Sequence, residues 1–223
     1  MISERSYNQY CGVARALDLV GERWALLIVR ELVLGPKRFT DLREGLPGIA
    51  TNVLSNRLRQ LERDGVVTRR QFPPPAPAQV YELTEYGRDL VPIMLALGRW
   101  GARTMGPRTP VQSIRSEWLA VALKAFFDAD AAMGLTATVT VTLDGAPFTL
   151  RIAEGQLEVV HGAAGPVDLS IASDTESLLR FLAGAPVRIE AEGDRDLLAR
   201  LPELFSLGAS AGLSGARASA RAR

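Results

Sequence analysis

The segment 51–64 constrains the fold of this chain most, because it combines a regular leucine repeat with an otherwise polar composition. Leu54, Leu58 and Leu61 recur at helical spacing, and Gly65 follows as a helix stop. The other positions carry short hydrogen-bonding side chains or arginines: Thr51, Asn52, Ser55, Asn56, Arg57, Arg59 and Arg63. Such a helix, about 21 Å long, is long enough to lie in a major groove and to contact base edges and phosphates. A solvated polar face is the alternative interpretation.

The hydrophobic period changes directly after this helix. Residues 66–71 and 79–83 alternate as two strands around a proline-rich loop, and Thr84–Met105 is expected to be one long helix. Three shorter helical stretches precede residue 51, so the predicted order is four helices, a hairpin and a helix, a winged helix-turn-helix. Arg69 and Arg70 lie on the hairpin, where a wing flanks the DNA backbone. The candidate DNA-contacting residues are Arg38, Thr51, Asn52, Ser55, Asn56, Arg57, Arg59, Arg69 and Arg70.

Charge divides the chain into two halves. Residues 1–106 hold 15 Lys and Arg against 11 Asp and Glu, whereas residues 107–206 hold 8 against 14. A basic half joined to an acidic half indicates two modules with different partners, and the basic half suits a polyanion. Gly106 and two prolines at 107 and 110 interrupt any helix between them. The predicted organisation is a DNA-binding and dimerisation domain over 1–106, a linker over 107–112, a second domain over 113–206 and a mobile tail over 207–223.

The second half is predicted to be an α+β domain. A helix over 113–133 precedes strands that alternate polar and apolar residues, with turns at Asp144-Gly145 and Glu154-Gly155. The expected architecture is an antiparallel sheet with helices on one face. Such a layer forms either a solid core or an apolar cavity, and the composition does not distinguish them.

The first half contains an ordered set of motifs: YCGVARALDLVGERW (10–24), LIVREL (27–32), FTDL (39–42), PGIA (47–50), LSNRL (54–58), LERDGVV (61–67), VYELTEYG (80–87) and Trp100. With this set, which covers about residues 7–105, the first half resembles the HxlR-type winged-helix transcriptional regulators. The resemblance implies a homodimer that pairs through its first and last helices and binds double-stranded DNA. A two-fold dimer in turn predicts a palindromic operator. The wing tip, 72–78, departs from expectation because it has no Lys or Arg.

The second half is similar to sterol-carrier-protein domains. The similarity is carried by VDLSIASD (167–174), LLRFLAG (178–184) and VRIEAEGD (187–194). It implies a cavity for a fatty acid, a sterol or another lipophilic molecule. The candidate ligand-binding residues are Trp118, Phe126, Phe127, Val141, Phe148, Leu150 and Phe181. Two functions remain open: a DNA-binding regulator that senses an apolar ligand, and a lipid carrier that uses the first half only to dimerise.

Cysteine and histidine are too scarce for metal or catalytic chemistry. With only Cys11 and His161, no His/Cys metal site and no intrachain disulfide is expected, and neither an enzyme nor a cofactor is predicted. Cys11 has two interpretations, a redox sensor and a small buried core residue near the dimer interface. The composition is typical of a cytoplasmic protein, and neither a signal peptide nor a membrane span is expected.

Overall fold

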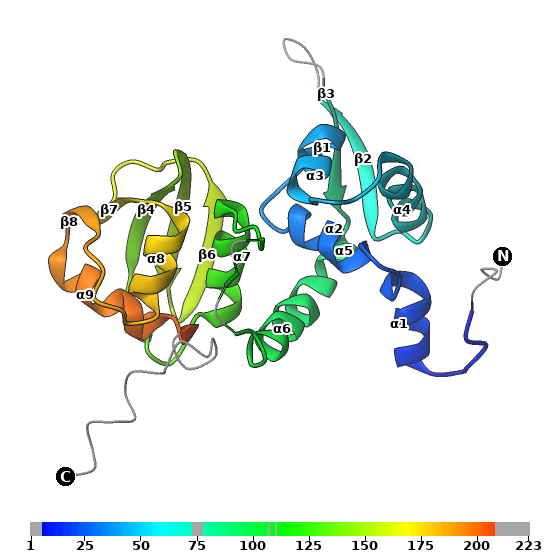
Figure 1. Ribbon diagram of the computed structural model, residues 1–223. Helices are drawn as coiled ribbons and strands as arrows, with labels where there is room; N and C mark the ends of the chain where they lie inside the picture. The colour runs from blue at the N-terminus through cyan, green and yellow to red at the C-terminus, as the bar shows by residue number, and fades with distance from the viewer. Residues whose placement is uncertain (1–5, 73–77, 107, 110, 208–223) are drawn as a thin grey trace. The chain divides into compact units, whose positions relative to one another are not determined.

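The computed structural model describes residues 6–72, 78–106, 108–109 and 111–207 (Figure 1). The backbone divides into two compact units, Met1–Met94 and Leu95–Arg223, and the division falls inside helix α6 (Leu90–Ala102). The predicted linker over 107–112 follows α6 and stays a proposal, and the predicted mobile tail lies outside the described residues apart from Leu207.

The first unit is a helical domain with a small antiparallel sheet. Its elements before α6 are α1 (Gly12–Val20), α2 (Ala25–Leu32), β1 (Lys37–Arg38), α3 (Phe39–Gly45), α4 (Thr51–Arg63), β2 (Val67–Phe72), β3 (Ala78–Leu83) and α5 (Glu85–Arg88). The sheet has the order β1-β3-β2, in which β2 and β3 form the wing. Gly65 has a φ of 73°, the left-handed conformation that a glycine helix stop adopts. The winged helix-turn-helix order predicted from the periodicity is confirmed.

The long helix predicted over Thr84–Met105 is wrong in one respect, because the structure divides it into α5 and α6. Asp89 separates the two helices. Pro92 explains the break, since a proline ring clashes with the carbonyl four residues before it, here that of Arg88. Proline is tolerated in the first turn of a helix, where Pro92 now lies.

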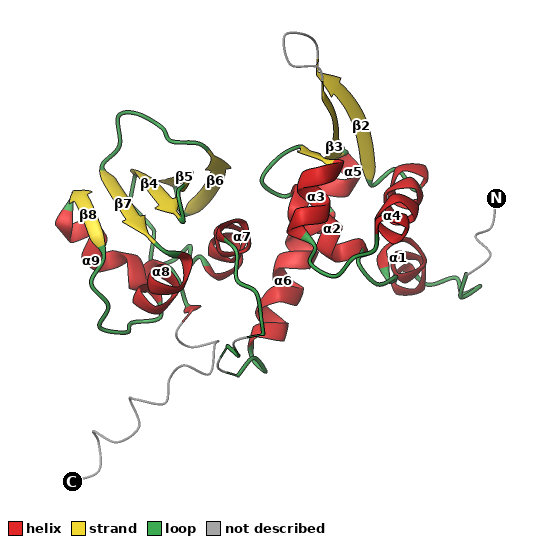
Figure 2. Cartoon of the chain, turned by 45° about the horizontal axis from the view of Figure 1, so that its top comes forward, coloured by secondary structure: helices red, strands yellow, loops and turns green. Residues whose placement is uncertain are grey.

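The second unit is a five-stranded sheet covered on one face by helices. Its elements are α7 (Ser116–Phe126), β4 (Ala137–Leu143), β5 (Ala146–Ala153), β6 (Gln156–His161), β7 (Leu169–Ser173), α8 (Thr175–Leu182), β8 (Glu190–Gly193) and α9 (Arg195–Leu204), with the strand order β6-β5-β4-β7-β8. Figure 2 shows α7, α8 and α9 on the same side of the sheet. The predicted turn at Asp144-Gly145 is present, with φ values of 50° and 84°.

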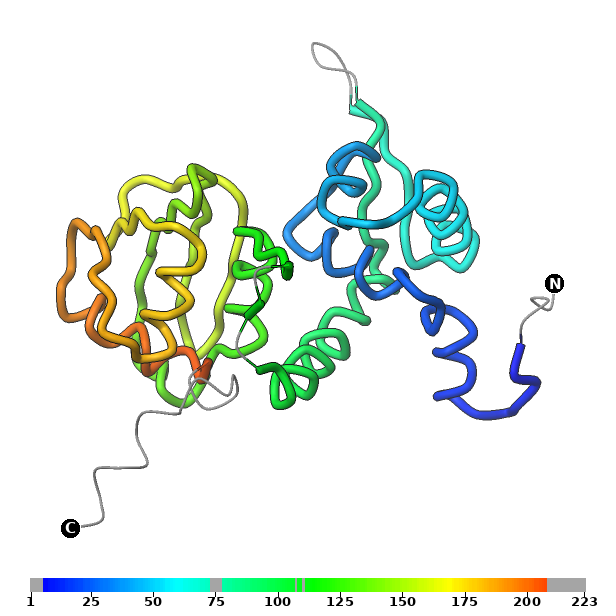
Figure 3. The backbone as a smooth tube through the Cα atoms, in the orientation of Figure 1, coloured from blue at the N-terminus to red at the C-terminus, as the bar shows by residue number. Residues whose placement is uncertain are grey.

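The sheet is mixed, so the prediction of an antiparallel sheet needs correction. β4 pairs antiparallel with β5 but parallel with β7, where Val139 lies opposite Leu169. Figure 3 follows the chain from the end of β6 through residues 162–168 to the start of β7 on the other side of β4. Alternation reveals which face a side chain occupies but not the direction of its strand, which this crossover sets.

The helix predicted over 113–133 is also shorter than expected. α7 ends at Phe126, and Phe127 forms an isolated bridge with Phe205. The carboxylate of Asp128 then accepts a hydrogen bond from the backbone N–H of Ala131, at 3.0 Å. These local bonds replace the helical ones and turn the chain away from α7.

Candidate nucleic-acid interface

Helix α4 is anchored by its leucines and exposes a polar stripe. Leu54, Leu58 and Leu61 are buried in the core of the first unit, together with residues of α2 and the wing. Positions three, four and seven residues apart share one side of a helix. The opposite stripe, here called the reading face, consists of the exposed residues Thr51, Asn52, Asn56, Arg59 and Arg63 and the half-buried Ser55. The reading face therefore presents hydroxyl, carboxamide and guanidinium groups to the solvent.

Two residues of the reading face are oriented by each other. The guanidinium of Arg59 donates a hydrogen bond to Oδ1 of Asn56, one turn earlier on α4. The Oδ1 atom of Asn52 accepts a hydrogen bond from the backbone N–H of Val53 at 2.9 Å. These bonds restrict the side-chain rotamers of Asn52, Asn56 and Arg59 before a ligand binds, which lowers the entropic cost of binding.

Arg57 does not lie on the reading face. Its side chain is only 16% exposed, and its Nη2 atom lies 3.1 Å from Oε2 of Glu22, in the turn between α1 and α2. Its Nη1 atom donates to Oε1 of Gln60 at 2.6 Å. Two residues along a helix correspond to about 200° of rotation, so Arg57 and Arg59 point in nearly opposite directions. The structure thus separates Arg57 from the residues with which it was grouped.

The wing places its two arginines on opposite faces of the β2–β3 ribbon. Arg69 is paired in register with Tyr81, and its Nη2 atom lies 2.8 Å from Oε2 of Glu62 on α4. Arg70 lies on the other face, 3.6 Å from Oε2 of Glu82. Only Arg69 is therefore brought next to α4. The wing tip over 73–77 lies outside the described residues.

Arg38 is exposed on β1, at the far edge of the small sheet. Strand β3 separates it from β2 and hence from the two wing arginines. Its backbone N–H donates to Oδ2 of Asp41 at 2.9 Å, and this bond begins α3. The structure leaves its side chain in solvent but does not group it with Arg69.

A buried carboxylate that the sequence reasoning missed holds the start of the helix-turn-helix. Glu31 of α2 is buried, with Oε2 2.7 Å from Nζ of Lys37 and Oε1 2.8 Å from Nη2 of Arg30. Its carboxylate also lies where a side chain on Gly45 would be, so the end of α3 packs directly on it. The available signal was an acidic residue within the apolar helical stripe of α2, between Ile28 and Leu32.

Comparison with known proteins agrees with this geometry. The model of the HxlR-like helix-turn-helix family matches residues 19–109. The uncharacterized HTH-type transcriptional regulator YdeP of Bacillus subtilis is 39% identical over 93 residues, which are 42% of this chain and 73% of YdeP. The chain belongs to the HxlR-like helix-turn-helix family.

Other relatives cover the same half of this HxlR-like chain. The HTH-type transcriptional regulator YybR of B. subtilis is 37% identical over 109 residues, 49% of this chain and 85% of YybR. The solved structure of the redox regulator HypR in its reduced form is 37% identical, with a TM-score of 0.39, and covers 41% of this chain and 90% of that one. The family match ends at residue 109, before the sheet of the second unit.

The HxlR-like chain exposes apolar side chains on α1 and α6. Val13 and Leu17, together with the preceding Tyr10, are exposed at helical spacing near α1. Ile93, Leu97 and Trp100 are exposed at the same spacing on α6, and Trp100 is 68% exposed. Contiguous exposed apolar stripes of this kind mark surfaces that bind other proteins.

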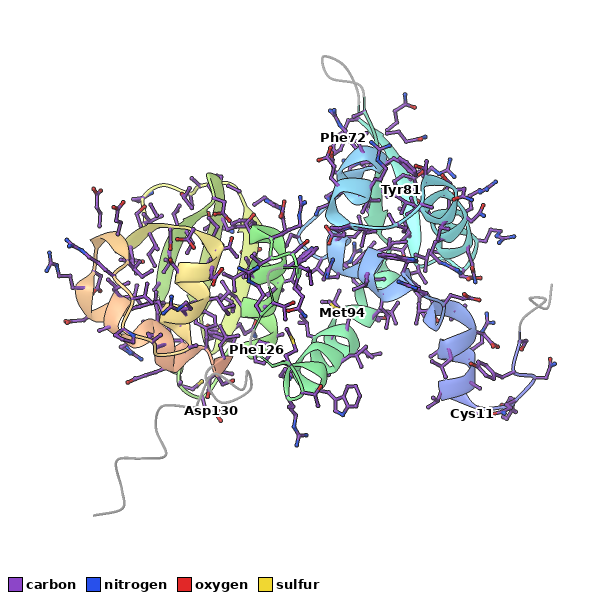
Figure 4. All side chains as sticks on the ribbon, viewed as in Figure 1. Cys11, Phe72, Tyr81, Met94, Phe126 and Asp130 are labelled. Carbon is purple, nitrogen blue, oxygen red and sulfur yellow. The ribbon has the colours of Figure 1, made fainter. Side chains whose placement is uncertain are left out.

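Cys11 is an exposed thiol, so the interpretation as a buried core residue is wrong for the single chain. Figure 4 shows it at the first turn of α1, at the opposite end of its unit from Phe72 on the wing. Hydrogen bonding from the backbone N–H groups of Ala14 and Val13 lowers the pKa of this thiol.

Of the seven predicted ligand-binding residues, all within the described part of the chain, only Val141 and Leu150 line the cavity beneath the helices. Val141, Phe148, Leu150 and Phe126 are buried, whereas Trp118, Phe127 and Phe181 are half-buried. The cavity among Val141, Leu150 and the helix residues that cover them has a volume of about 10 Å³. That volume holds about one water molecule and leaves no room for an acyl chain.

Elsewhere the described part of the second unit offers a polar groove rather than an apolar one. This groove, of about 540 Å³, runs along β8, and its charged lining residues include Arg188, Glu190, Glu192 and Arg195. Within the described residues there is no group of three His, Cys, Asp or Glu side chains placed to hold a metal ion. None of the described helices is both long and apolar enough to span a membrane.

Proposed function

We propose that this chain is a dimeric, sequence-specific regulator of transcription that binds double-stranded DNA through α4. The observation that carries the proposal is the reading face, a polar stripe held outward by three buried leucines. Asn and Arg side chains form paired hydrogen bonds with adenine and guanine in the major groove. Arg69 at the wing base lies beside α4, where a groove-bound helix brings the DNA backbone within reach.

Dimerisation through α1 and α6 is the second part of the proposal. The exposed stripes around Val13 and Trp100 are the surfaces available for a second copy. In a two-fold dimer the two α4 helices enter successive major grooves about 34 Å apart, and the operator is palindromic. The names of the relatives, HTH-type transcriptional regulators, support the DNA-binding part of the proposal.

Replacing Arg59 tests the proposal. Duplexes selected from a random pool by the full chain would be labelled, and their affinity measured by fluorescence anisotropy at several salt concentrations. Arg59→Ala is expected to weaken binding by about 5- to 150-fold, the value of one base-reading arginine. Arg151→Ala removes an exposed arginine of the second unit and serves as the matched control, with unchanged affinity expected. Equal affinity of both variants would reject the reading face.

We propose in addition that the second unit senses a lipophilic ligand. The similarity of residues 113–206 to sterol-carrier domains supports it, but the 10 Å³ interior requires the helices to move before a lipophilic molecule enters. A lipid carrier without DNA binding is the alternative, and salt-dependent affinity for duplex DNA separates the two functions. A fluorescent fatty acid titrated into the full chain reports directly on whether the interior opens.

A redox role for Cys11 also stays a prediction. Its exposure and lowered pKa favour the reactive thiolate. Cys11→Ser should then abolish any loss of DNA affinity that diamide causes in the parent protein. Equal responses of the two proteins to diamide would exclude Cys11 as the sensor.

A further inference from the structure

Among the arginines of α4, all of them described in the structure, Arg57 forms an ion pair with the turn between α1 and α2. Its guanidinium reaches Glu22 with Nη2 and Gln60 with Nη1, at 3.1 and 2.6 Å. Its Nε atom is buried and has no hydrogen-bond partner within the described residues. A side chain held in this way is not available to a phosphate unless the pair with Glu22 breaks.

Glu22 is itself fixed by a rigid turn. The turn begins at Gly21, where any side chain would collide with the carbonyl of Leu17. It ends at Trp24, which adopts a left-handed φ of 79° at the start of α2. Trp24 and Val53 of α4 both pack against the core of the first unit. The pair of Glu22 and Arg57 therefore joins two segments that both pack on the same core.

The positive charge of Arg15 on α1 also acts on the end of α4. Burial raises the pKa of the Asp64 carboxyl, and the positive charges of Arg15 and Arg63 oppose this shift. Arg15 belongs to α1, and Asp64 terminates α4. Helix α4 thus forms an ion pair near its middle with the turn that follows α1, and its end lies within the electrostatic influence of α1.

We propose that Arg57 is a positioning residue, which fixes the orientation of α4 against the α1–α2 turn through its ion pair with Glu22 and does not contact DNA. This role rests on the proposed function of α4 as the recognition helix. Residues 22 and 57 are then coupled in DNA binding although neither lies on the reading face.

The direction in which Glu22→Gln changes DNA affinity separates a positioning role of Glu22 from that of a simple surface charge. Removing a negative charge from a DNA-binding unit strengthens its long-range attraction to phosphates. Glu22→Gln is nearly isosteric and removes one such charge. If Glu22 serves only as a surface charge, this variant binds DNA more tightly, whereas loss of a positioning contact makes it bind more weakly.

The experiment is a double-mutant cycle on the full chain. Glu22→Gln, Arg57→Gln, the double variant and the charge-swapped pair Glu22→Arg with Arg57→Glu would be compared by anisotropy on a selected duplex. Circular dichroism at the assay temperature would show that each is folded. Each single variant is expected to weaken binding about fivefold or more, and the double variant no more than either single one. The swapped pair should recover part of the affinity.

The salt dependence of DNA binding is a second measurement that distinguishes direct phosphate contact from positioning. A phosphate-contacting arginine contributes about one unit to the slope of log affinity against log salt, so a positioning role predicts an unchanged slope for Arg57→Gln. Glu85→Gln removes an exposed carboxylate of α5 in the same unit and is the matched control, expected to bind as tightly as the parent or slightly more tightly.

Each outcome decides between the two roles. Glu22→Gln binding as tightly as the parent, or additive losses in the cycle, would overturn the positioning role while the parent still binds DNA. Failure of the parent itself to bind any selected duplex would reject the proposed function, and this role with it. If Glu22→Gln proves unfolded, Glu22→Asp keeps the charge, shortens the reach and is expected to lose affinity in the same way.

Discussion

The reading face of α4 and the inner face of the second unit's sheet differ in exposure, because the first faces solvent and the second is covered by helices. Both elements alternate apolar and polar side chains and bury the apolar set. On α4 the remaining side is a stripe of amides and guanidinium groups that faces solvent. In the sheet the informative side is the apolar one, and three helices cover it with about 10 Å³ left inside.

This difference shows where function can be inferred from packing. An exposed set of hydrogen-bonding side chains satisfies the solvated face of an amphipathic helix and is also accessible to a partner. A filled apolar core satisfies itself, and its residues indicate stability first. The exposed side chains of the first unit therefore indicate where a partner could bind, whereas the packed core of the second unit gives no such indication.

The largest effect is expected from the exposed stripe of α6. Trp100→Asp places a charge on the surface proposed to join two subunits, and a dimer that buries this stripe would have to desolvate that charge. The variant should be monomeric by sedimentation equilibrium. Its affinity for a palindromic duplex should fall by about 100-fold or more, because each half-site then binds independently.

Met133→Asp is the control for this variant, because Met133 is a comparably exposed apolar residue of the second unit. It should leave both the oligomeric state and the DNA affinity unchanged. If the Trp100→Asp variant is still dimeric, the subunit contact does not involve the exposed stripe of α6.

The next effect tests the filled interior of the sheet. Phe148 is fully buried on β5, so Phe148→Ala should lower the free energy of unfolding by about 3–5 kcal/mol in a denaturant titration. Phe72→Ala removes an exposed ring from the wing and should cost far less. A loss below about 1 kcal/mol for Phe148→Ala would show that the interior is loosely packed and would favour the ligand-binding interpretation.

The sequence predicts individual helices and turns better than it predicts how the strands pair. The periodicity of α4 and the Asp144-Gly145 hairpin follow from local preferences, and both are present in the structure. The parallel pairing of β4 with β7 depends on a crossover that leaves no mark in the alternation. The break at Asp89 had a local signal, Pro92, which a reading of hydrophobic spacing alone passes over.

The candidate site shows the same limit. The helical repeat places Arg57 about 200° from Arg59, so its separation from the reading face is implied by the sequence. Its partner Glu22 lies 35 residues away and only the fold brings the two together. The filled interior of the second unit depends on how side-chain volumes interlock, and composition carries no information about that.

The smallest effect compares two ion pairs of equal length, one in each unit. Arg69 and Glu62 are 2.8 Å apart with side chains 37% and 34% exposed, and Arg151 and Glu158 are 2.8 Å apart with side chains 50% and 57% exposed. Exposed pairs contribute about 0–1 kcal/mol, so a phosphate displaces either carboxylate at little cost.

Glu62→Gln should release Arg69 beside the reading face and tighten binding to duplex DNA by up to about fivefold at low salt, with the gain disappearing as salt rises. Glu158→Gln removes the same charge from the second unit and should change the affinity by less than the error of an anisotropy titration. Because both variants alter the net charge equally, a gain specific to Glu62→Gln locates the DNA backbone at the base of the wing. Equal gains would mean that only the total charge matters and that Arg69 makes no contact.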